Sequence, residues 1–464
     1  MHLHIFNRDL VGVHVWRQTQ TQINIENFAF NAFNIFNPKS YSLHHPDFLY
    51  RYEFPLMQWI FACFYKIFGN HIIISRSLTF VIGLFSVLGI YRLLNSLFHK
   101  PSIHLFGIWA FCFSPVFYYY IVNPLPDNFA LCMGIWSLYY FFSYINKESS
   151  KKAFFSYLFL CLAALAKLPF VIYGLPWIIY FVRNLKKNSI SVAFKSFDLF
   201  LFLLPAFCWY SWVIPTWAGN GIIKGIMGSE NVGIKELLHI MQSNLISTLP
   251  ELLVNYGSVL FFITGLVLVF RLKIYKLPKG MYLSILGIAL IAYFLFEMNM
   301  IGTVHDYYLF PFLPLLFILV AYGANFLMYS NIKGLRVFST FCLLILPLTA
   351  FLRINQRWNI EEPGFNKDLY VYKNELRKVV PDNAICISGN DRSAHIWPYY
   401  LHKKSWSFCD NTINESEWNN YLNQGAHYLY SDSRELEAKP YVQSKIKRMI
   451  MEKGSIRVFE LSNQ

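Results

Sequence analysis

Four short polar segments interrupt an otherwise apolar chain, and they carry side chains of the types that bind phosphate and move protons. The segments read HHPDFLYRYEFPL, NPLPDNFAL, ALAKLPF and GTVHDYYLFPFLP. Their key residues are His44, His45, Asp47, Arg51 and Glu53 in the first, Asp127 in the second, Lys167 in the third, and His305, Asp306, Tyr307 and Tyr308 in the fourth. Ionisable residues at the ends of membrane spans are energetically costly and are often functional.

Together these residues suit chemistry on a lipid-linked phosphate. A cation such as Lys167 holds the phosphate, and a carboxylate such as Asp127, Asp306 or Glu53 deprotonates an acceptor hydroxyl. A divalent metal ion held by Glu53 and His305 would share the phosphate charge.

Each residue also has a purely structural explanation. Asp127 and Glu53 could cap the helices that follow them. Lys167 could extend its ammonium group to the membrane interface. Tyr307 and Tyr308 are typical of an interfacial aromatic belt. The concentration of all these groups on one predicted side of the membrane favours the functional interpretation.

A fifth polar segment, GVHVWRQTQTQINIENF, lies near the start of the chain. Gln18, Gln22 and Glu26 are spaced four residues apart, which predicts one face of a helix. Its proposed substrate-binding residues, which offer hydrogen-bond donors and a stacking ring, are His14, Trp16, Arg17 and Gln18. Glu26 is the only acid in the segment and a candidate catalytic residue.

The composition predicts a polytopic membrane protein, because 55% of the 464 residues are hydrophobic and only 14% are charged. A spanning helix needs about 20 mostly apolar residues. Ten apolar windows are expected to span: 77–97, 103–122, 129–144, 153–166, 170–182, 197–214, 254–270, 282–296, 308–327 and 337–352. The segment EFPLMQWIFACFYKIFG is shorter and predicts a helix lying in the membrane interface.

The net charge of +14 is concentrated in alternate short loops, so it argues for membrane topology and against nucleic-acid binding. Loops rich in Lys and Arg face the cytoplasm. This assignment places the five polar segments and both chain ends outside. The chain begins without a segment that would export its first residues. Two explanations stay open, namely a truncated first helix and an unusual insertion route.

Three regions are expected. Residues 1–75 form an extracytoplasmic first loop with interfacial helices, residues 76–353 a transmembrane domain of about ten helices, and residues 354–464 a small extracytoplasmic α/β domain. In the last region, GFNKDLYVYKNELRKVV predicts an amphipathic helix, and AICISG, HYLYS and SIRVFEL predict strands. Cys386 and Cys409 lie there and could form a disulfide.

The order of these motifs resembles the GT-C superfamily of integral-membrane glycosyltransferases, in particular protein mannosyltransferases and lipid A aminoarabinose transferases. The resemblance rests on the acid-x-Pro-Leu segment at Glu53, the span opening at Arg76, the loop of Asp127, the turn of Lys167, and the W-R-Q and H-x-Y-Y segments. It covers roughly residues 9–328 and implies a first transmembrane helix ahead of the first outer loop.

The resemblance implies transfer of a sugar from a polyprenyl-phosphate donor to a cell-envelope glycan, lipid or protein, at the outer face of a bacterial inner membrane and without a nucleotide cofactor. Lys167 and Arg76 or Arg17 would bind the phosphate. Members of the family typically carry an acidic residue early in the first outer loop. This chain has Arg17, Gln18, Thr19 and Gln20 at that place instead. The substitutes are Asp9, Glu26, Asp47 and Glu53.

Alternative functions are a non-catalytic lipid-carrier binder or transporter and a polymerase or ligase of lipid-linked glycans. A transporter would show interrupted helices at the membrane midplane in two related halves. The polar groups here are instead predicted to gather at one face.

Overall fold

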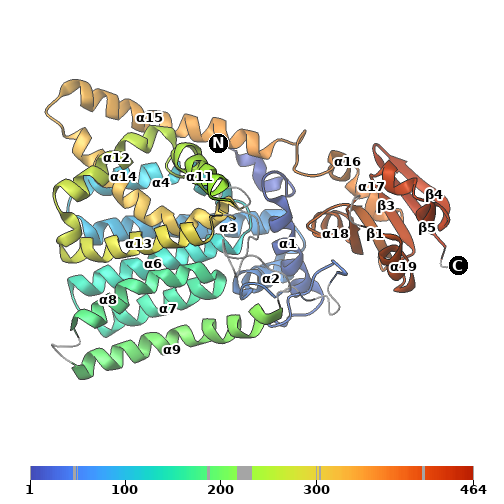
Figure 1. Cartoon of the computed structure of the whole chain (residues 1–464), viewed down its shortest axis with the longest axis horizontal. Coiled ribbons are helices and arrows are strands. Elements are labelled where there is room, and N and C mark those ends of the chain that lie inside the picture. Colours follow the sequence, from blue (N-terminus) through green and yellow to red (C-terminus); the bar gives the residue numbers. More distant parts are fainter. Residues whose placement is uncertain are drawn as a thin grey trace. The chain divides into compact units, whose positions relative to one another are not determined.

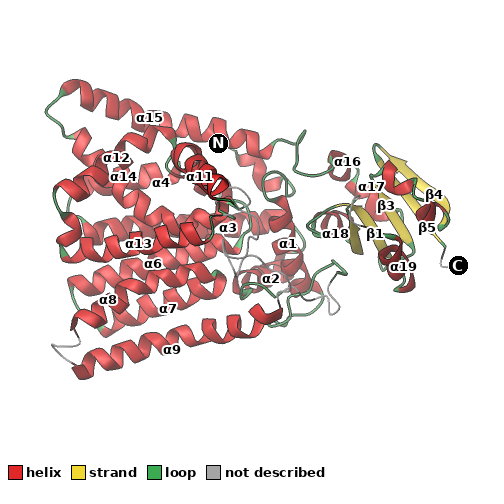
Figure 2. Cartoon of the chain, in the orientation of Figure 1, coloured by secondary structure: helices red, strands yellow, loops and turns green. Residues whose placement is uncertain are grey.

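Helices make up most of the chain, and a small sheet follows them near the C-terminus (Figures 1 and 2). The computed structural model describes residues 2–44, 49, 51–184, 189–216, 233–298, 300–301, 305–409 and 413–462, with only the backbone of 189–193. The chain divides into two compact units. The helical unit contains Met1–Leu3, Tyr52–Met57 and Arg76–Asn355, and the mixed unit contains His4–Arg51, Gln58–Ser75 and Gln356–Gln464.

The helical unit is a bundle of mainly antiparallel helices (Figure 1). Its main helices are α3 (Ile72–Leu97), α4 (Pro101–Cys112), α5 (Pro115–Tyr120), α6 (Pro126–Asn146), α7 (Ser150–Ala166), α8 (Leu175–Asn184), α9 (Ser189–Val213), α11 (Ile234–Ser243), α12 (Val259–Arg271), α13 (Pro278–Phe296), α14 (Leu313–Met328) and α15 (Lys333–Asn355). Four of them, α4, α5, α6 and α13, begin at a proline, whose fixed φ and missing N–H suit the first helical position. Shorter 3₁₀ segments include η2 (Leu168–Gly174) and η8 (Asp306–Phe312), and a π-helix, η5, covers Asn244–Leu253.

All ten predicted apolar windows overlap helices, but the number of spans differs from the expected ten. Among the described residues, five helices are long and apolar enough to cross a membrane, or six if the pair Ile234–Leu253 and Tyr256–Arg271, bent by 99°, counts as one span. The helices α4 and α8 have 12 and 10 residues, which is too short at about 1.5 Å per residue for a core of about 30 Å. Helix α7, with 17 residues, is at the lower limit of length for a span. The longer α6 is mostly buried among other helices, so it tolerates tyrosine and serine side chains that lower its hydropathy.

The predicted basic loops meet at one end of the helical unit. Lys279 Nζ, at the start of α13, donates a hydrogen bond to the carbonyl of Ser96 at the end of α3, over 2.8 Å. Asn146, which ends α6, donates to the same carbonyl over 2.9 Å. Lys152, in the first turn of α7, donates to the carbonyl of Ser143 over 2.7 Å. Loops that are far apart in the sequence therefore gather at a single basic end.

The sheet of the mixed unit has the strand order β2-β1-β3-β5-β4. The strands are β1 (Ile385–Asn390), β2 (Lys404–Phe408), β3 (Tyr428–Ser431), β4 (Ile446–Lys453) and β5 (Ile456–Leu461). The pairs β1–β2 and β1–β3 are parallel, and β3–β5 and β4–β5 are antiparallel. The three predicted strands are confirmed as β1, β3 and β5, while β2 and β4 were not predicted.

The single amphipathic helix predicted near residues 364–380 is wrong in one respect. The segment forms two short helices, α16 (Lys367–Val371) and α17 (Lys373–Lys378), separated at Tyr372. Its apolar side chains Leu369 and Leu376 are buried, as the spacing predicts. Cys386 and Cys409 are both free cysteines in the structure, so the disulfide considered as possible for them is not formed.

Helix α1 (Val15–Phe30) packs against the sheet domain within the mixed unit. Leu10, Val15 and Ile23 share a hydrophobic cluster with Leu369 and Tyr400, the latter on α18 (Ile396–Leu401). The backbone N–H of Gly12 also donates to the carbonyl of Pro363 over 2.8 Å. Helix α1, the residues just before it and the C-terminal domain therefore build one core. The 13-residue helix α2 (Leu56–Phe68) is too short to span, as expected.

Candidate functional site

In the helical unit, Lys167 and Asp127 form a largely buried ion pair. Helix α7 ends at Ala166, and Lys167 adopts an extended backbone ahead of Pro169. This turn directs its Nζ to within 3.1 Å of Asp127 Oδ1, in the first turn of α6. The Asp127 side chain is 1% exposed and that of Lys167 is 14% exposed. A pair with so little solvent around it is only weakly screened, so each charge fixes the other.

Two tyrosines surround the ammonium group of Lys167. The Lys167 Nζ lies 4.4 Å from the centre of the Tyr308 ring and 5.3 Å from that of Tyr307. Both distances allow cation–π attraction. The Tyr307 hydroxyl is 3.1 Å from His305 Nδ1, which is hydrogen-bond distance. The segment HDYY therefore covers the cation with aromatic rings and adds an imidazole beside them.

Asp306 and Arg76 are tied to the segment between α5 and α6. The Tyr120 hydroxyl donates to Asp306 Oδ1 over 2.6 Å. The fully buried Arg76 donates from Nη1 to the carbonyl of Val122 over 3.1 Å and to Asn123 Oδ1 over 2.7 Å. The contacts of Arg76 hold the segment that precedes α6, the helix whose first turn contains Asp127.

Glu53 lies beside the end of α7. The Phe54 backbone N–H donates to the carbonyl of Leu165 over 3.0 Å, and Trp209 Nε1 donates to the carbonyl of Tyr52 over 3.1 Å. The residues on both sides of Glu53 are thus fixed, and Glu53 itself is buried. The helical unit therefore gathers, around α7, the polar segments of Glu53, Asp127, Lys167 and His305. His45 and Asp47 of the first segment lie outside the described residues.

The sequence analysis missed Glu297, which directly follows α13. Glu297 is 6% exposed, and its Oε2 has no hydrogen-bond partner among the described residues. Lys167 lies close enough for its charge to act on this carboxylate. The available signal was a lone ionisable residue at the end of an apolar window, as it was for Lys167.

The described residues do not fit the metal site considered for Glu53 and His305. Within this part of the chain, no group of three or more His, Cys, Asp or Glu side chains is placed to hold a metal ion. A catalytic metal usually has about three protein ligands.

In the mixed unit, α1 is confirmed as a helix. Most of its predicted binding residues make contacts with neighbouring residues of the same unit. His14 precedes α1 in a left-handed conformation with φ 54°. Gln18 Nε2 donates to the carbonyl of Val13 over 3.0 Å, and Arg17 donates to Gln20 Oε1. Trp16 packs against the hydrophobic cluster that joins α1 to the sheet domain. These contacts set the start and the orientation of α1.

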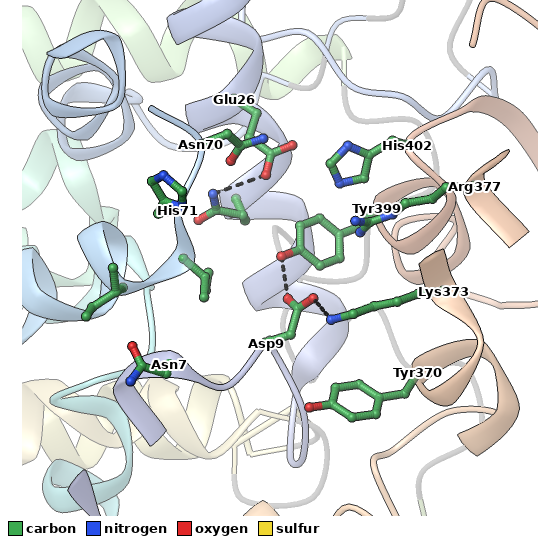
Figure 3. A pocket seen from close by; sticks show the side chains of 13 residues that line it. Asn7, Asp9, Glu26, Asn70, His71, Tyr370, Lys373, Arg377, Tyr399 and His402 are labelled. Carbon is green, nitrogen blue, oxygen red and sulfur yellow. Dashed lines mark hydrogen bonds and ion pairs between the residues drawn. The ribbon is translucent and has the colours of Figure 1, made fainter. Parts of the chain in front are cut away.

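A pocket of about 380 Å³ lies within the mixed unit (Figure 3). Its lining combines residues of the N-terminal region, of the start of α3 and of the C-terminal domain: Asn7, Asp9, Gln22, Glu26, Asn70, His71, Ile72, Ile73, Tyr370, Lys373, Arg377, Tyr399 and His402. Glu26 was predicted as a site residue and Asp9 as a substitute acid. None of the C-terminal members was predicted as a site residue. Tyr370, Lys373 and Arg377 belong to the predicted amphipathic segment, whereas Tyr399 and His402 lie on α18 and at its end.

The two acids of this pocket have opposite pKa shifts. Burial raises the pKa of Glu26 to about 7, while the hydrogen bond from Gln22 and the nearby Asn70 side chain act to lower it. Burial also acts to raise the pKa of Asp9, but the charge of Lys373 and hydrogen bonds from Lys373, Tyr399 and Leu10 lower it overall. Asp9 is therefore a fixed anion, whereas Glu26 exchanges a proton near neutral pH.

Residues 44–212 match the family model of dolichyl-phosphate-mannose-protein mannosyltransferases. A sequence search found no match among curated proteins.

Among solved structures, ArnT from Cupriavidus metallidurans in the apo state is similar over 99% of this chain and 96% of that chain, with a TM-score of 0.68 and 11% identity. The same protein bound to undecaprenyl phosphate gives a TM-score of 0.65 and 12% identity over 98% of this chain and 96% of that chain. The archaeal oligosaccharyltransferase AglB from Archaeoglobus fulgidus, in complex with an inhibitory peptide and a dolichol-phosphate, gives a TM-score of 0.56 and 13% identity over 91% of this chain and 66% of that chain. The predicted fold, helical and membrane-embedded with a small C-terminal α/β domain, is confirmed.

Proposed function

We propose that this chain, which has the fold of the GT-C integral-membrane glycosyltransferases, transfers a sugar from a polyprenyl-phosphate donor to a cell-envelope acceptor. The observation that carries the proposal is the buried Lys167–Asp127 pair under the rings of Tyr307 and Tyr308. This arrangement offers one oriented cation at the end of the helical unit opposite the basic loops.

The reaction requires stabilisation of a leaving phosphate. The acceptor oxygen forms a bond to the anomeric carbon of the donor, the bond from that carbon to the phosphate oxygen breaks, and the acceptor proton passes to a base. The phosphodiester becomes a monoester, so negative charge grows on the leaving group. Lys167 is suited to stabilise that charge because it is already oriented by Asp127 and does not need to reorganise.

The proton acceptor is proposed among Glu53, Asp127, Asp306 and Glu26. Asp127 is paired with Lys167, and Asp306 accepts a hydrogen bond from Tyr120, so both are held in positioning roles. We favour Glu53, a buried acid of the same helical unit as Lys167, whose neighbour Phe54 is bonded to the end of α7. Arg76 supports the neighbouring turn through Val122 and Asn123.

The membrane orientation is also a proposal. The basic ends of α3, α6, α7 and α13 lie together. The positive-inside rule assigns this end to the cytoplasm. Lys167, Asp127 and His305 would then act on the outer side, which for a bacterial cell means the periplasmic face of the inner membrane.

Reconstitution of the full chain in liposomes with polyprenyl-phosphate-linked sugars tests the function. We expect sugar transfer to an envelope extract, with strong loss in Lys167→Gln and little change in Lys151→Gln, a matched lysine at the basic end. Addition of a chelator reports separately on any dependence on divalent metal. Absence of transfer with every donor, together with unchanged lipid binding in Lys167→Gln, would refute the proposal.

One observation favours a second candidate, a non-catalytic binder of the lipid carrier. The family's first-loop acid is replaced by Gln18 and neighbouring uncharged residues, and Gln18 is committed to the carbonyl of Val13. Tight binding of polyprenyl phosphate that depends on Lys167, without turnover of any donor, would identify this function instead.

A further inference from the structure

We propose that the pocket of the mixed unit binds a saccharide, and that this saccharide is the acceptor of the reaction. The acceptor role rests on the proposed function, whereas the binding of a saccharide does not. The acceptor, which could otherwise be a glycan, a lipid or a protein, would then be a molecule that presents sugar hydroxyls.

The pocket has the size and chemistry of a small polar ligand. Its volume of about 380 Å³ lies within the range of roughly 300–1,000 Å³ for ligand sites. Its lining contains hydrogen-bond acceptors such as Asp9 and Glu26 and donors such as Lys373 and Arg377. Sugar hydroxyls both donate and accept hydrogen bonds, so a mixed lining of this kind satisfies them.

The charged groups of the pocket largely balance one another. Asp9 accepts hydrogen bonds from Lys373 Nζ, with which it forms an ion pair, and from the Tyr399 hydroxyl at 2.6 Å. Figure 3 shows Lys373 and Tyr399 pointing from the C-terminal domain toward Asp9. The pocket therefore needs no counter-ion to stabilise it, which favours a hydroxyl-rich ligand over a strongly anionic one.

Glu26 supplies an unused hydrogen-bonding atom. Its side chain is 3% exposed, and its Oε2 has no hydrogen-bond partner among the described residues. Its Oε1 accepts from Gln22 Nε2 over 3.3 Å, and Gln22 is itself held by Tyr65 at 2.9 Å and by Ser75 at 2.8 Å. A buried polar atom without a partner costs about 1–3 kcal/mol, and a ligand hydroxyl at this position would remove that cost.

Aromatic and cationic side chains complete the lining. Tyr370, on α16, has the Nζ of Lys373 5.0 Å from its ring centre, and both residues line the pocket. Tyrosine rings offer a flat apolar surface together with a polar hydroxyl, as the C–H faces and hydroxyls of a sugar require. Arg377 Nε donates to the carbonyl of Tyr400 over 2.6 Å, which fixes the guanidinium at the pocket wall.

A binding experiment on the detergent-solubilised full chain tests the inference. The probes are an array of immobilised oligosaccharides with neutral, uronic-acid and phosphorylated sugars, and soluble inorganic phosphate as competitor. We expect retention on neutral sugars that phosphate does not displace. Glu26→Ala and Tyr370→Ala should each weaken it about tenfold or more.

Matched controls separate this inference from the proposed function. Glu375→Gln changes an exposed acid on α17 outside the pocket lining and should bind sugars like the wild type. Lys167→Gln should lose polyprenyl-phosphate binding but keep sugar binding. Wild-type protein that binds polyprenyl phosphate but no sugar would overturn the inference, as would equal sugar binding by both pocket variants. Displacement by inorganic phosphate would overturn it in favour of an anion site.

Discussion

Lys167 Nζ lies 3.1 Å from Asp127 Oδ1, although the two residues belong to different helices and different sequence motifs. The pair unites the end of α7 with the start of α6, and η8 adds the rings of Tyr307 and Tyr308. A buried lysine without its carboxylate would be strongly disfavoured, so the two residues depend on each other.

The first prediction concerns this pair. Lys167→Gln and Asp127→Asn should each reduce transfer by about 100-fold, since each removes an oriented charge from a poorly solvated site. Initial rates in liposomes, with thermal unfolding as a check on folding, measure the effect. A loss confined to thermal stability, with transfer unchanged in the folded fraction, would contradict the assigned role.

The hydrogen bond from the Tyr120 hydroxyl to Asp306 can be tested by removing that hydroxyl. Tyr120→Phe deletes the donor of a 2.6 Å hydrogen bond and leaves the ring in place. The expected cost is about 1–3 kcal/mol of stability, because a buried carboxylate loses a donor. Thermal unfolding gives the shift, and Tyr329→Phe, at an exposed tyrosine, is the control. Equal melting temperatures for Tyr120→Phe and the wild type would show that the bond contributes nothing.

The raised pKa of Glu26 predicts a pH dependence of stability. The pKa is about 7 in the folded protein against an ordinary value of 4.5. Stabilisation from the protonated form is fully present below pH 4.5 and is lost as pH rises to about 7, since the unfolded chain releases the proton first. The loss amounts to about 3 kcal/mol. Glu26→Gln should therefore gain stability relative to the wild type over this interval.

Melting temperatures of both proteins between pH 4 and 8 measure this difference. Charged and titratable neighbours of Glu26 in the pocket are Asp9, Lys373, Arg377, His71 and His402. Burial, followed by the charge of Arg377, lowers the pKa of His402 to about 4, so His402 is neutral over most of this range and gains charge only at its acid end. His71→Asn is the control for the other imidazole. A constant difference between wild type and Glu26→Gln at all pH values would exclude the raised pKa.

Asp9 and Lys373 should be energetically coupled. Their ion pair joins the N-terminal residues before α1 to α17. Because the pKa of Asp9 is lowered in the folded protein, the pair stabilises the fold above the ordinary pKa of 3.8, and this stabilisation is lost as the pH falls further. In a double-mutant cycle with Asp9→Asn and Lys373→Met, we expect a coupling of about 1–3 kcal/mol. Additive effects of the two substitutions would show that the contact is not stabilising.

Gly389 should tolerate no side chain. A Cβ atom there would lie 2.1 Å from Cζ2 of Trp397, and Trp397 is almost fully buried. Gly389→Ala should destabilise the sheet domain by about 1–3 kcal/mol through overpacking. Gly334→Ala, where nothing lies within 4 Å, is the matched control. Limited proteolysis of the C-terminal region reports the change, and equal resistance of both variants would contradict it.

Local patterns explain why much of the architecture was predictable. The apolar windows, the polar interruptions between them and the alternation of strands such as SIRVFEL are properties of neighbouring residues. Strand β4 was missed because IKRMIMEK contains Lys, Arg, Met and Glu, which favour helices when taken alone. Its pairing with β5 overrides that preference.

The sequence by itself determined the membrane class, the basic loops, helix α1 and the residues able to do chemistry, because composition and spacing encode local structure and solvent preference. Only the tertiary structure decided that Lys167 pairs with Asp127, that Glu297 lies within reach of Lys167, and that Glu26 shares a pocket with Lys373 and Arg377. These relationships join residues far apart in the chain, and the packing that joins them depends on many side chains at once. The pKa of Glu26 has the same origin, since burial by distant segments raises it.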